Sequence, residues 1–567
     1  MAFFRTSFKP FLGDPVHSVV FQYAELKSGV AVILGFVPFG LFGDANSSLN
    51  LHLKVNDSVI PIFLGNMKEF RFNGGIVRGA CFSFAIGTGF PCGDFNVEIR
   101  GSNGVTAIPI AVGPNFPLTF SYRHQWLRLP DDRFLRLTPT GGFRVFHASL
   151  CARFFAECSL LCELLKHGTI PEAVAAVTRL CYHFWRPFHR GRYWIFSDKL
   201  SNPIDSAYSI AKTLVENEKF ANEKVVPYYV IDGKHSLRVK LPGKMKTVRY
   251  LSLRHRLLSL AAEANITSEK GYTPFVPGAS YSDITAWQFR VSSLHGLVHH
   301  DLSSIYGRDS VNFNLMIAGV KREAEYERSG LWGYAHDDVI CCGLPRWDDR
   351  ESAPQKKISI SFTWRSELVE SSHPVTKELS FGTMFENSEY RRRLNSFLSN
   401  RHLKELAEKY GYSLEFLPHP LIRNAMSFLK IPSYVHVVPE ETPYEEVYRG
   451  TSLFVTDYSS VAMDMAYLGK PVIYYQFDHD DFYATQGYTE SYFSWKEDGF
   501  GPVVTEEENV IAEIERLLER DCVREEKYEH RAHLFFPERD KKNGLRACCA
   551  IFKRLEECRR PRGGKSE

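Results

Sequence analysis

The sequence lacks the long apolar run that a membrane-spanning helix requires. Its longest apolar stretch, residues 29–43, is interrupted by glycine and proline and covers about 15 residues, whereas a span needs roughly 20. The chain also lacks a large excess of either charge, because 69 basic and 66 acidic residues leave a net charge of +3. We therefore expect neither an integral membrane protein nor one with a nucleic-acid partner, which would need a concentrated basic face.

Cysteine patterns that bind metals or form disulfide frameworks are missing, although the chain has 12 cysteines. No Cys-x-x-Cys occurs, and the adjacent pairs Cys341–Cys342 and Cys548–Cys549 fit no zinc site. The opening MAFFRTSFKPFL contains neither the apolar core nor the cleavage site of a secretory signal. We expect reduced thiols in the cytoplasm, and we predict no metal and no separate cofactor.

Several common catalytic signatures are absent as well. The chain has no Walker phosphate loop, no glycine-rich dinucleotide fingerprint, no serine nucleophile elbow and no His-Glu-x-x-His motif. These absences argue against a P-loop nucleotidase, a dinucleotide-dependent oxidoreductase, an α/β-hydrolase and a zinc protease. Any chemistry has to come from other polar residues, and in open α/β sheets these lie at the ends of strands.

What the chain does contain changes character along its length. Its 567 residues predict about two to four domains. Residues 1–140 hold short β-rich runs, such as 51–55 and 105–112, between clusters of Gly, Asn, Asp and Pro. This pattern predicts an all-β, sandwich-like domain, whose role the sequence does not indicate.

Residues 143–192 are helical in pattern and admit two interpretations. The second of two helical segments ends in Arg186, His189, Arg190 and Arg192, which lie beside tryptophan and phenylalanine. Such a segment packs inside the protein as a helical hairpin, or lies on a membrane surface, because anionic lipid attracts a basic end with interfacial aromatics. The sequence leaves both interpretations open.

From residue 193 onward, apolar strands alternate with helical stretches, including a predicted helix over 386–409. This alternation predicts an α/β fold of two doubly wound, Rossmann-like lobes. We assign residues 141–345, with the leading helical segment, to the first lobe and residues 346–555 to the second. Residues 556–567 are predicted to be a basic tail. Such a pair of lobes binds its ligand in the cleft, at the carboxyl ends of the strands.

The stretch LFVTDYSSVAMDMAYLGKPVIYY, residues 453–475, follows a strand with polar residues and then a helix. Thr456 and Asp457 end the strand, Ser459 and Ser460 stand at the helix start, and Asp464 follows in the helix. The serines could simply cap the helix by accepting a backbone N–H. They could also form an anion site, because free N–H groups, hydroxyls and the helix dipole favour a phosphate.

Three further motifs place polar residues at strand ends of the predicted lobes. They are LHGLVHHDLSSIYG with His295, His299, His300 and Asp301, GLPRWDDR with Arg346, and FLPHP with His419. Each residue alone has a structural interpretation. Together they supply the base, the cations and the hydrogen-bond donors that transfer of a phosphoryl group requires.

These motifs resemble those of the CDP-glycerol glycerophosphotransferase family. The resemblance rests on VTDYSSVAMDMAYLGKPVIYYQFD, GLPRWDD, LPHP, SFTWR, DGFGPVV and the closing FPERDKKNGLRACCAIFKRL, and it covers residues 190–555. It implies a glycosyltransferase-B-like fold and a peripheral enzyme on the cytoplasmic face of the cell membrane. Such an enzyme moves a polyol phosphate from CDP-glycerol or a similar CDP-polyol to an undecaprenyl-linked glycan or a growing chain. It releases CMP during synthesis of teichoic acid or a capsule-type polymer.

The resemblance also implies roles for single residues. His295 falls on the catalytic base, and His419 on a second catalytic histidine beside the donor phosphates. Ser459 and Ser460 fall on the pair that binds the diphosphate. Three other residues belong with donor binding: Thr456, Asp457 and Asp464. Arg346 falls on an arginine that we expect to face the phosphates.

The chain departs from the family pattern at the first histidine. Many members read Trp-His-Gly-Thr-Pro-Leu-Lys there, whereas this chain reads Leu-His-Gly-Leu-Val-His-His and lacks the lysine. His299 or His300, with Asp301 beside them, is therefore an alternative base. The departure leaves the polyol open. Two other functions stay open too, a nucleotide-sugar-dependent glycosyltransferase of the same fold and a glycan-binding protein without activity, and a homo-oligomer is compatible with either.

Overall fold

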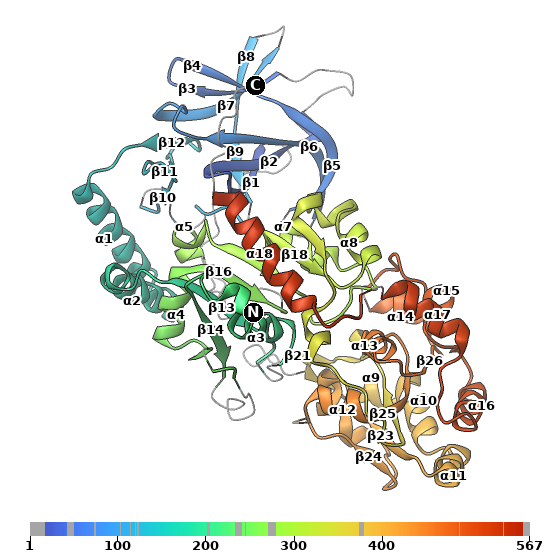
Figure 1. The fold of residues 1–567 in the computed structure, drawn as a ribbon. Helices are drawn as coiled ribbons and strands as arrows, with labels where there is room; N and C mark the ends of the chain where they lie inside the picture. Colours follow the sequence, from blue (N-terminus) through green and yellow to red (C-terminus); the bar gives the residue numbers. More distant parts are fainter. Residues whose placement is uncertain are drawn as a thin grey trace, which may run out of the picture.

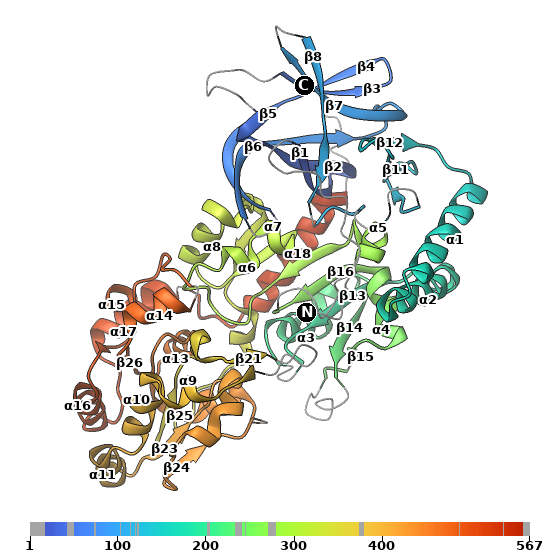
Figure 2. The ribbon, with the colours of Figure 1, turned by 180° about the vertical axis from the view of Figure 1, so that it is seen from behind.

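The computed structural model describes most of the chain (Figures 1 and 2). The described residues are 18–41, 50–72, 75–101, 104–113, 115–118, 121, 124–200, 204–232, 241–243, 245–269, 279–372, 379–440, 442–486, 488–536 and 538–559. They form a β module, a helical hairpin and two α/β lobes. The α/β fold class predicted from the sequence, with two doubly wound lobes after an all-β region, is confirmed.

The β module consists of two sheets, almost entirely antiparallel, that pack on a phenylalanine-rich core. One sheet has the order β5-β6-β2-β1-β9, and the other has the order β10-β11-β12-β7-β3-β4 with β8 paired to β7. Phe143 stacks on Phe21 and Phe95 between them, with ring centroids 5.1 and 5.5 Å apart. Half-buried strands alternate in burial as the two-residue repeat requires. The strands are β1 (Val19–Lys27), β2 (Val30–Pro38), β3 (Asn50–Val55), β4 (Ser58–Ile62), β5 (Leu64–Phe72), β6 (Gly75–Ile86), β7 (Gly93–Gly101), β8 (Gly104–Ile108), β9 (Ile110–Val112), β10 (Leu127–Arg128), β11 (Phe134–Leu137) and β12 (Phe143–Phe146).

A helical hairpin, α1 (Leu150–Lys166) and α2 (Ile170–Trp185), follows the module. The hydroxyls of Ser149 and Thr169 accept hydrogen bonds from the first turns of the two helices and so begin them. The inner face of the hairpin packs on the first lobe through Leu160, Leu164 and neighbouring residues. Its outer face is exposed. The packed face agrees with the interpretation as an internal hairpin, and the membrane-surface interpretation stays a prediction.

The first lobe is built on a seven-stranded parallel sheet with the order β15-β14-β13-β16-β17-β18-β19. Helices on its two faces bury the central strands, so these read as continuous apolar runs. Its strands are β13 (Arg192–Ser197), β14 (Val225–Ile231), β15 (Lys246–Arg249), β16 (Ala262–Thr267), β17 (Phe289–Ser292), β18 (Leu315–Ala318) and β19 (Val339–Cys341). Its helices are α3 (Ser206–Glu216), α4 (Leu253–Ala261), α5 (Ser282–Thr285), α6 (Ser303–Tyr306), α7 (Arg308–Val311) and α8 (Lys321–Glu327).

The second lobe has a six-stranded parallel sheet with the order β24-β23-β20-β25-β26-β27. The predicted helix over 386–409 is two helices, α10 and α11, because Asn400 accepts the N–H of Leu403 and begins a new helix. The strands are β20 (Lys357–Ser361), β23 (Ser413–Phe416), β24 (Val435–Val437), β25 (Thr451–Thr456), β26 (Val472–Tyr475) and β27 (Val503–Val504), and β21 (Ser371–Ser372) pairs with β22 (Leu379–Ser380) outside the sheet. The helices are α9 (Thr383–Glu386), α10 (Glu389–Leu398), α11 (Arg401–Tyr410), α12 (Tyr444–Gly450), α13 (Val461–Tyr467), α14 (His479–Thr485), α15 (Trp495–Asp498), α16 (Glu507–Leu518) and α17 (Glu526–Phe535).

The last helix, α18 (Asn543–Arg559), returns from the second lobe to the first (Figure 1). Its residues Ala547, Cys548 and Ile551 are buried in the core of the first lobe. The division at 346–555 placed most of this helix with the second lobe, whereas its apolar face is buried against the first. Helix α18 also includes residues 556–559 of the predicted tail, and residues 560–567 lie outside the described part of the chain.

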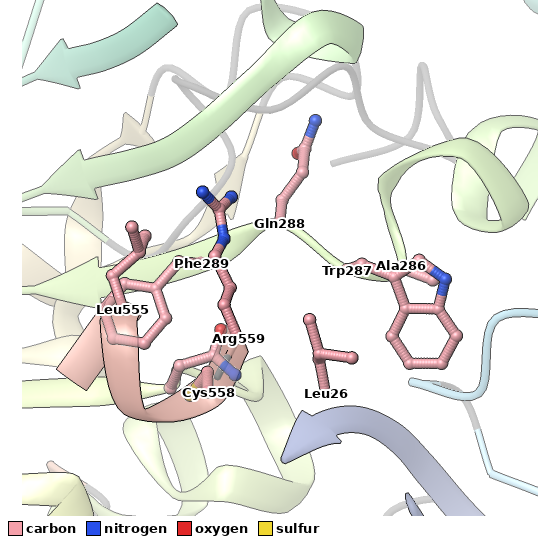
Figure 3. A pocket seen from close by; sticks show the side chains of 9 residues that line it. Leu26, Ala286, Trp287, Gln288, Phe289, Leu555, Cys558 and Arg559 are labelled. Atoms are coloured by element: carbon pink, nitrogen blue, oxygen red, sulfur yellow. The ribbon is translucent and has the colours of Figure 1, made fainter. Parts of the chain in front are cut away.

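The β module is fixed to the first lobe by buried charges and by α18. Arg308 of α7 forms ion pairs with Glu25 of β1 and with Asp338, the latter at 3.0 Å. Figure 3 shows where the module, the first lobe and α18 meet, around a cavity of about 20 Å³ lined by Leu26, Trp287, Leu555 and others. Among the described residues, no helix is both long and apolar enough to cross a bilayer.

Candidate active site

A cavity of about 160 Å³ lies between the two lobes, at the carboxyl ends of β17, β20, β23 and β25. Both lobes contribute to its lining, as expected for doubly wound sheets. From the first lobe come Leu294, His295, Gly296, Leu297, Val298, His299, His300, Leu302 and Tyr306, and from the second come Thr363, Trp364, His419, Tyr458, Ser459, Ser460 and Tyr488. The structure thus brings together the four residues on which the predicted chemistry depends, His295, His419, Ser459 and Ser460.

The two serines do different things at the start of α13. Ser459 Oγ accepts the N–H of Val461 at 3.3 Å, so this serine makes the local bond that a capping interpretation expects. Ser460 makes no capping bond with its side chain. Its hydroxyl faces the cavity wall at Gly296, and it is therefore able to donate a hydrogen bond to a ligand. Helix α13 has only seven residues.

Gly296 lies against Ser460 across the boundary between the lobes. A Cβ built on Gly296 would stand 2.9 Å from Ser460 Oγ and 3.2 Å from Ser460 Cβ. The backbone of the first lobe can approach the serine turn this closely only because residue 296 has no side chain. The His-Gly sequence is therefore a packing requirement as well as a motif.

His295 projects from the loop after β17, and 54% of its side chain is exposed. Its backbone is fixed on both sides, because its N–H donates to the carbonyl of Ser268 at 3.1 Å and its carbonyl accepts from Arg346. Nδ1 lies 3.9 Å from Oε1 of Glu269, which is mostly buried. A carboxylate on the Nδ1 side leaves Nε2 free to accept a proton. The sequence analysis missed Glu269, which no motif marks.

His419 begins the 3-10 helix at Pro420–Phe428, directly after β23. Its Nδ1 accepts the N–H of Leu421 at 3.2 Å, so in the neutral ring Nε2 carries the proton. Burial lowers the pKa of His419 to about 3, with the charges of Lys199 and His295 adding to the effect. The ring lies over Trp364, with centroids 6.5 Å apart. In the unliganded cavity His419 is therefore a neutral hydrogen-bond donor.

Lys199 is a cation near the cavity that the sequence analysis did not predict. It follows β13 and is exposed, and its charge acts on His419. Lys199 lies in a different part of the first lobe from the position after His295, where the family pattern has a lysine and this chain has none. Only its position near a strand end could have indicated it, and many surface lysines share that feature.

Arg346 does not face the cavity, contrary to the expectation from the sequence. It is 4% exposed, and its guanidinium is engaged by Asp464 at 2.9 Å, by Asp205 at 3.0 Å and by the carbonyl of His295. Burial raises the pKa of Asp464, but the attraction of Arg346 and Arg350 outweighs it, so the pKa is lowered. Arg346 and Asp464 are thus a buried pair that holds the backbone of His295.

Thr456 and Asp457 also lie behind the cavity wall instead of lining it. The hydroxyl of Thr456 donates to the carbonyl of Ser361 at 2.6 Å. Asp457 accepts the N–H of Thr363 at 2.8 Å and pairs with Arg365 at 2.9 Å. Burial raises the pKa of Asp457. These bonds hold Thr363 and Trp364, in the SFTWR motif, at the edge of the cavity.

The alternative bases, His299 and His300, are buried by aromatic neighbours. Nε2 of His299 lies 2.9 Å from the carbonyl oxygen of Tyr458, and the ring of His300 stacks on Tyr488 at 5.1 Å. Burial lowers the pKa of both histidines. Asp301 accepts the N–H of Ser303 at 2.9 Å. These contacts leave His295 as the histidine most open to an acceptor.

No cluster of three or more His, Cys, Asp or Glu side chains that could hold a metal occurs among the residues with described positions. The polar side chains that line the cavity are those of four histidines, two serines, Thr363 and three tyrosines, with Lys199 nearby. This set is suited to hold a phosphate and to accept a proton from a hydroxyl.

Comparison with known proteins finds a family that matches part of the chain and solved structures with a similar fold. Residues 332–553 match the family described as CDP-Glycerol:Poly(glycerophosphate) glycerophosphotransferase. The Bacillus subtilis minor teichoic acid biosynthesis protein GgaB is 28% identical over 415 residues, which are 70% of this chain and 45% of that protein. The Staphylococcus epidermidis teichoic acid poly(glycerol phosphate) polymerase is 24% identical over 232 residues, 37% of this chain and 29% of that protein. The chain thus spans less than half the length of these curated relatives.

A solved structure of the wall teichoic acid polymerase TagF aligns with 71% of this chain and 98% of that chain. The TM-score is 0.50 at 17% sequence identity. At this level of identity the likeness concerns the fold. It supports the two-lobed arrangement that places the cavity between the sheets.

Proposed function

We propose that this chain transfers a polyol phosphate from a CDP-polyol to an acceptor hydroxyl, because residues 332–553 match the CDP-Glycerol:Poly(glycerophosphate) glycerophosphotransferase family. The donor is CDP-glycerol or a close analogue, and the second product is CMP. The observation that carries the proposal is the cavity that joins His295 of the first lobe to Ser460 and His419 of the second.

His295 acts as the general base in this proposal. Its Nε2 takes the proton of the acceptor hydroxyl as the hydroxyl oxygen attacks the β-phosphorus of the donor. The bond from that phosphorus to the bridging oxygen breaks, and its electron pair leaves with CMP. Glu269, 3.9 Å from Nδ1, stabilises the imidazolium that forms.

The second lobe holds the donor diphosphate. The hydroxyl of Ser460 and the Nε2–H of His419 donate to phosphate oxygens, and Lys199 supplies a positive charge from the first lobe. Groups that already stand in place when the CDP-polyol binds can stabilise developing charge without reorganising. Arg346 contributes by position, because it holds the carbonyl of His295 and pairs with Asp464 of α13.

The acceptor in this proposal is an undecaprenyl-linked glycan or a growing polyol-phosphate chain, and the enzyme works as a peripheral protein on the cytoplasmic face of the cell membrane. The outer face of the α1–α2 hairpin supports a membrane contact. It exposes Phe155, Leu165, Ile170, Val174 and Val177, and Phe188 follows. A helix pair with such a face and basic residues at its end suits an anionic bilayer surface.

Release of CMP tests the transfer. The full chain, incubated with CDP-glycerol and a lipid-linked disaccharide, should release CMP, and UDP- or GDP-sugars should release nothing. His295→Ala should lower the rate by about 10²–10⁴-fold, the usual contribution of a general base. His402→Ala, at an exposed histidine of α11, is the matched control and should keep the activity. Unchanged CMP release by the His295 variant would remove it from the mechanism.

A further inference from the structure

A second and larger hollow lies far along the first lobe from the catalytic cavity. It has a volume of about 1230 Å³, and we call it the hairpin groove. One wall is the α1–α2 hairpin, the other is the end of the β module around β10 and β11, and α5 closes it (Figures 1 and 2). Pockets that enclose drug-sized ligands have about 300–1,000 Å³, so this groove suits a longer ligand.

The walls of the groove carry large apolar side chains that remain partly exposed in the described chain. Phe154 of α1 is 67% exposed, Phe184 of α2 is 72% exposed and Leu180 is 47% exposed. Across from them stand Trp126 of the β module and Trp287 of the first lobe. Contiguous exposed apolar surface of this kind marks a site of interaction.

The acidic groups inside the groove are already neutralised. Glu157 pairs with Arg179 at 2.7 Å, and Asp283 pairs with the same guanidinium at 2.9 Å. The hydrogen bonds of Arg179 lower the pKa of Glu157 to about 2, although burial opposes them. Asp132 is held by Arg128. A sugar would therefore meet apolar walls and few free polar groups.

The rim of the groove carries positive charge that no carboxylate offsets. Arg153 lies over the ring of Phe134 at 5.3 Å, Arg186 donates to the carbonyl of His189 and contacts the hydroxyl of Tyr182, and Arg190 donates to the carbonyl of Pro187. Among the described residues, none of these three arginines forms an ion pair. A ligand that fits the groove therefore has an apolar body and an anionic head, and the guanidinium fork suits a phosphate.

We propose that the hairpin groove binds one anionic membrane phospholipid, with a hydrocarbon chain between the hairpin and the β module. The lipid phosphate is held at the rim by Arg153, Arg186 and Arg190. The inference rests on the proposed membrane contact of the hairpin, but not on the transfer reaction. Lipid binding in the groove goes beyond that contact, because a hydrocarbon chain would leave the bilayer and enter the protein.

The proposal gives the β module a physical role. The groove has only one wall without residues 124–134, because β10 and β11 form the side opposite the helices. Trp287 fixes this wall to the first lobe by donating its Nε1–H to the carbonyl of Arg128 at 2.7 Å. The module thereby completes a lipid site that the first lobe and hairpin only begin.

Quenching of tryptophan fluorescence by brominated lipid chains tests this inference. The full chain is mixed with phosphatidylcholine vesicles that contain phosphatidylglycerol brominated at mid-chain. Trp126 and Trp287 line the groove, whereas Trp185 ends α2 outside it and reports surface contact. We expect the variant Trp126→Phe/Trp287→Phe to lose most of the quenching per bound protein, and Trp185→Phe to lose little.

A charge pair separates lipid capture from membrane contact. Arg186→Gln and the control Lys166→Gln each remove one cation from the hairpin, but Lys166 does not line the groove. Both should weaken flotation with the vesicles by about fivefold at low salt. Only Arg186→Gln should also reduce quenching per bound protein. Neither variant alters the core, so a folding defect cannot imitate this result.

Three outcomes would overturn the proposal. The first is equal quenching of the groove double variant and the parent chain. The second is equal quenching by brominated phosphatidylcholine, which has no net headgroup charge. The third is flotation of the protein with vesicles without quenching of Trp126 and Trp287. This result would support the membrane contact but refute lipid binding in the groove. Release of CMP in detergent, measured in parallel, tests the transfer reaction separately.

Discussion

Gly296→Ala tests the geometry of the cavity most directly, because it adds a single methyl group between the lobes. Gly296 does not have a positive φ, so alanine is compatible with its backbone. The added Cβ would stand 2.9 Å from Ser460 Oγ and 3.2 Å from Ser460 Cβ. The hydroxyl can rotate away from the first contact. The second contact persists, because a Cβ moves only with its backbone.

The backbone around Ser460 has little freedom to retreat. The carbonyl of Ser459 accepts the N–H of Ala462 at 3.1 Å, and that of Ser460 accepts the N–H of Met463 at 3.0 Å. Relief of the contact therefore separates the lobes by a few tenths of an ångström or distorts the turn. Overpacking of this kind costs about 1–3 kcal/mol. If the cost falls on donor binding, kcat/KM drops by about 5- to 150-fold.

The assay is CMP release across a range of CDP-glycerol concentrations, together with thermal unfolding. We expect a higher KM for the donor and a Tm close to that of the parent chain, because the contact joins two lobes with separate cores. Gly89→Ala is the matched control. A Cβ at Gly89 meets nothing within 4 Å, and this glycine also has no positive φ.

Equal kinetics of the Gly296 and Gly89 variants would refute the reasoning. It would mean that Ser460 does not stand against Gly296 in the working enzyme and that the lobes are farther apart during catalysis. A large loss of Tm in the Gly296 variant alone would also contradict it. The contact would then belong to the folding core and not to the donor site.

Three further predictions concern the groups around the cavity. Glu269→Gln should lower kcat by about fivefold, because a carboxylate 3.9 Å from the imidazolium of His295 contributes about 1 kcal/mol even at the dielectric of water; an unchanged kcat would exclude this role. Arg346→Lys should lower stability by about 3–5 kcal/mol in denaturant titrations, since Asp464 would lose its paired guanidinium; weaker donor binding with full stability would instead place Arg346 on the phosphates. Burial lowers the pKa of His419 to about 3 from 6.5, so the unfolded chain binds more protons between these values and stability rises with pH there. His419→Asn should flatten that rise, and an unaltered slope would contradict it.

The fold could be predicted from the sequence because its pattern is local. Strand β25 is buried along its whole length and reads as an apolar run, whereas the strands of the β module alternate. The family resemblance, confirmed by the match over residues 332–553, rested on motifs in the loops after such strands. The strand ends then placed His295, His419 and the serines in one cavity, as the topology of parallel sheets requires.

The partners of buried charges could not be predicted, because they are far apart in the sequence. Arg346 and Asp464 are separated by 118 residues, and both belong to motifs that seemed to contact a ligand. A polar residue in such a motif either faces the ligand or holds the residues that face it. The sequence pattern is the same in both cases. Glu269 shows the reverse case, because it touches the base and belongs to no motif.

The boundary of the second lobe could not be predicted correctly either, because it depends on packing between residues far apart in the sequence. Helix α18 follows the second lobe in sequence, yet its apolar face is buried with β13 and α3 of the first lobe. The helical period predicts which face of a helix is buried but not against which lobe. The same holds for the α1–α2 hairpin, because the period could not tell which of its apolar residues pack on the first lobe and which stay exposed.

The placement of the β module has a consequence for how the lobes work together. Arg308 ties the module to the first lobe through Glu25 and Asp338, so module, hairpin and first lobe form one packed unit. In the proposed function this unit carries both the base, His295, and the membrane-facing surface. The second lobe carries most donors to the diphosphate and touches that unit at the Gly296–Ser460 contact. A movement between the lobes would then bring the nucleotide to an acceptor whose lipid stays in place. This mechanism requires a lipid site on the first unit, which is where the hairpin groove lies.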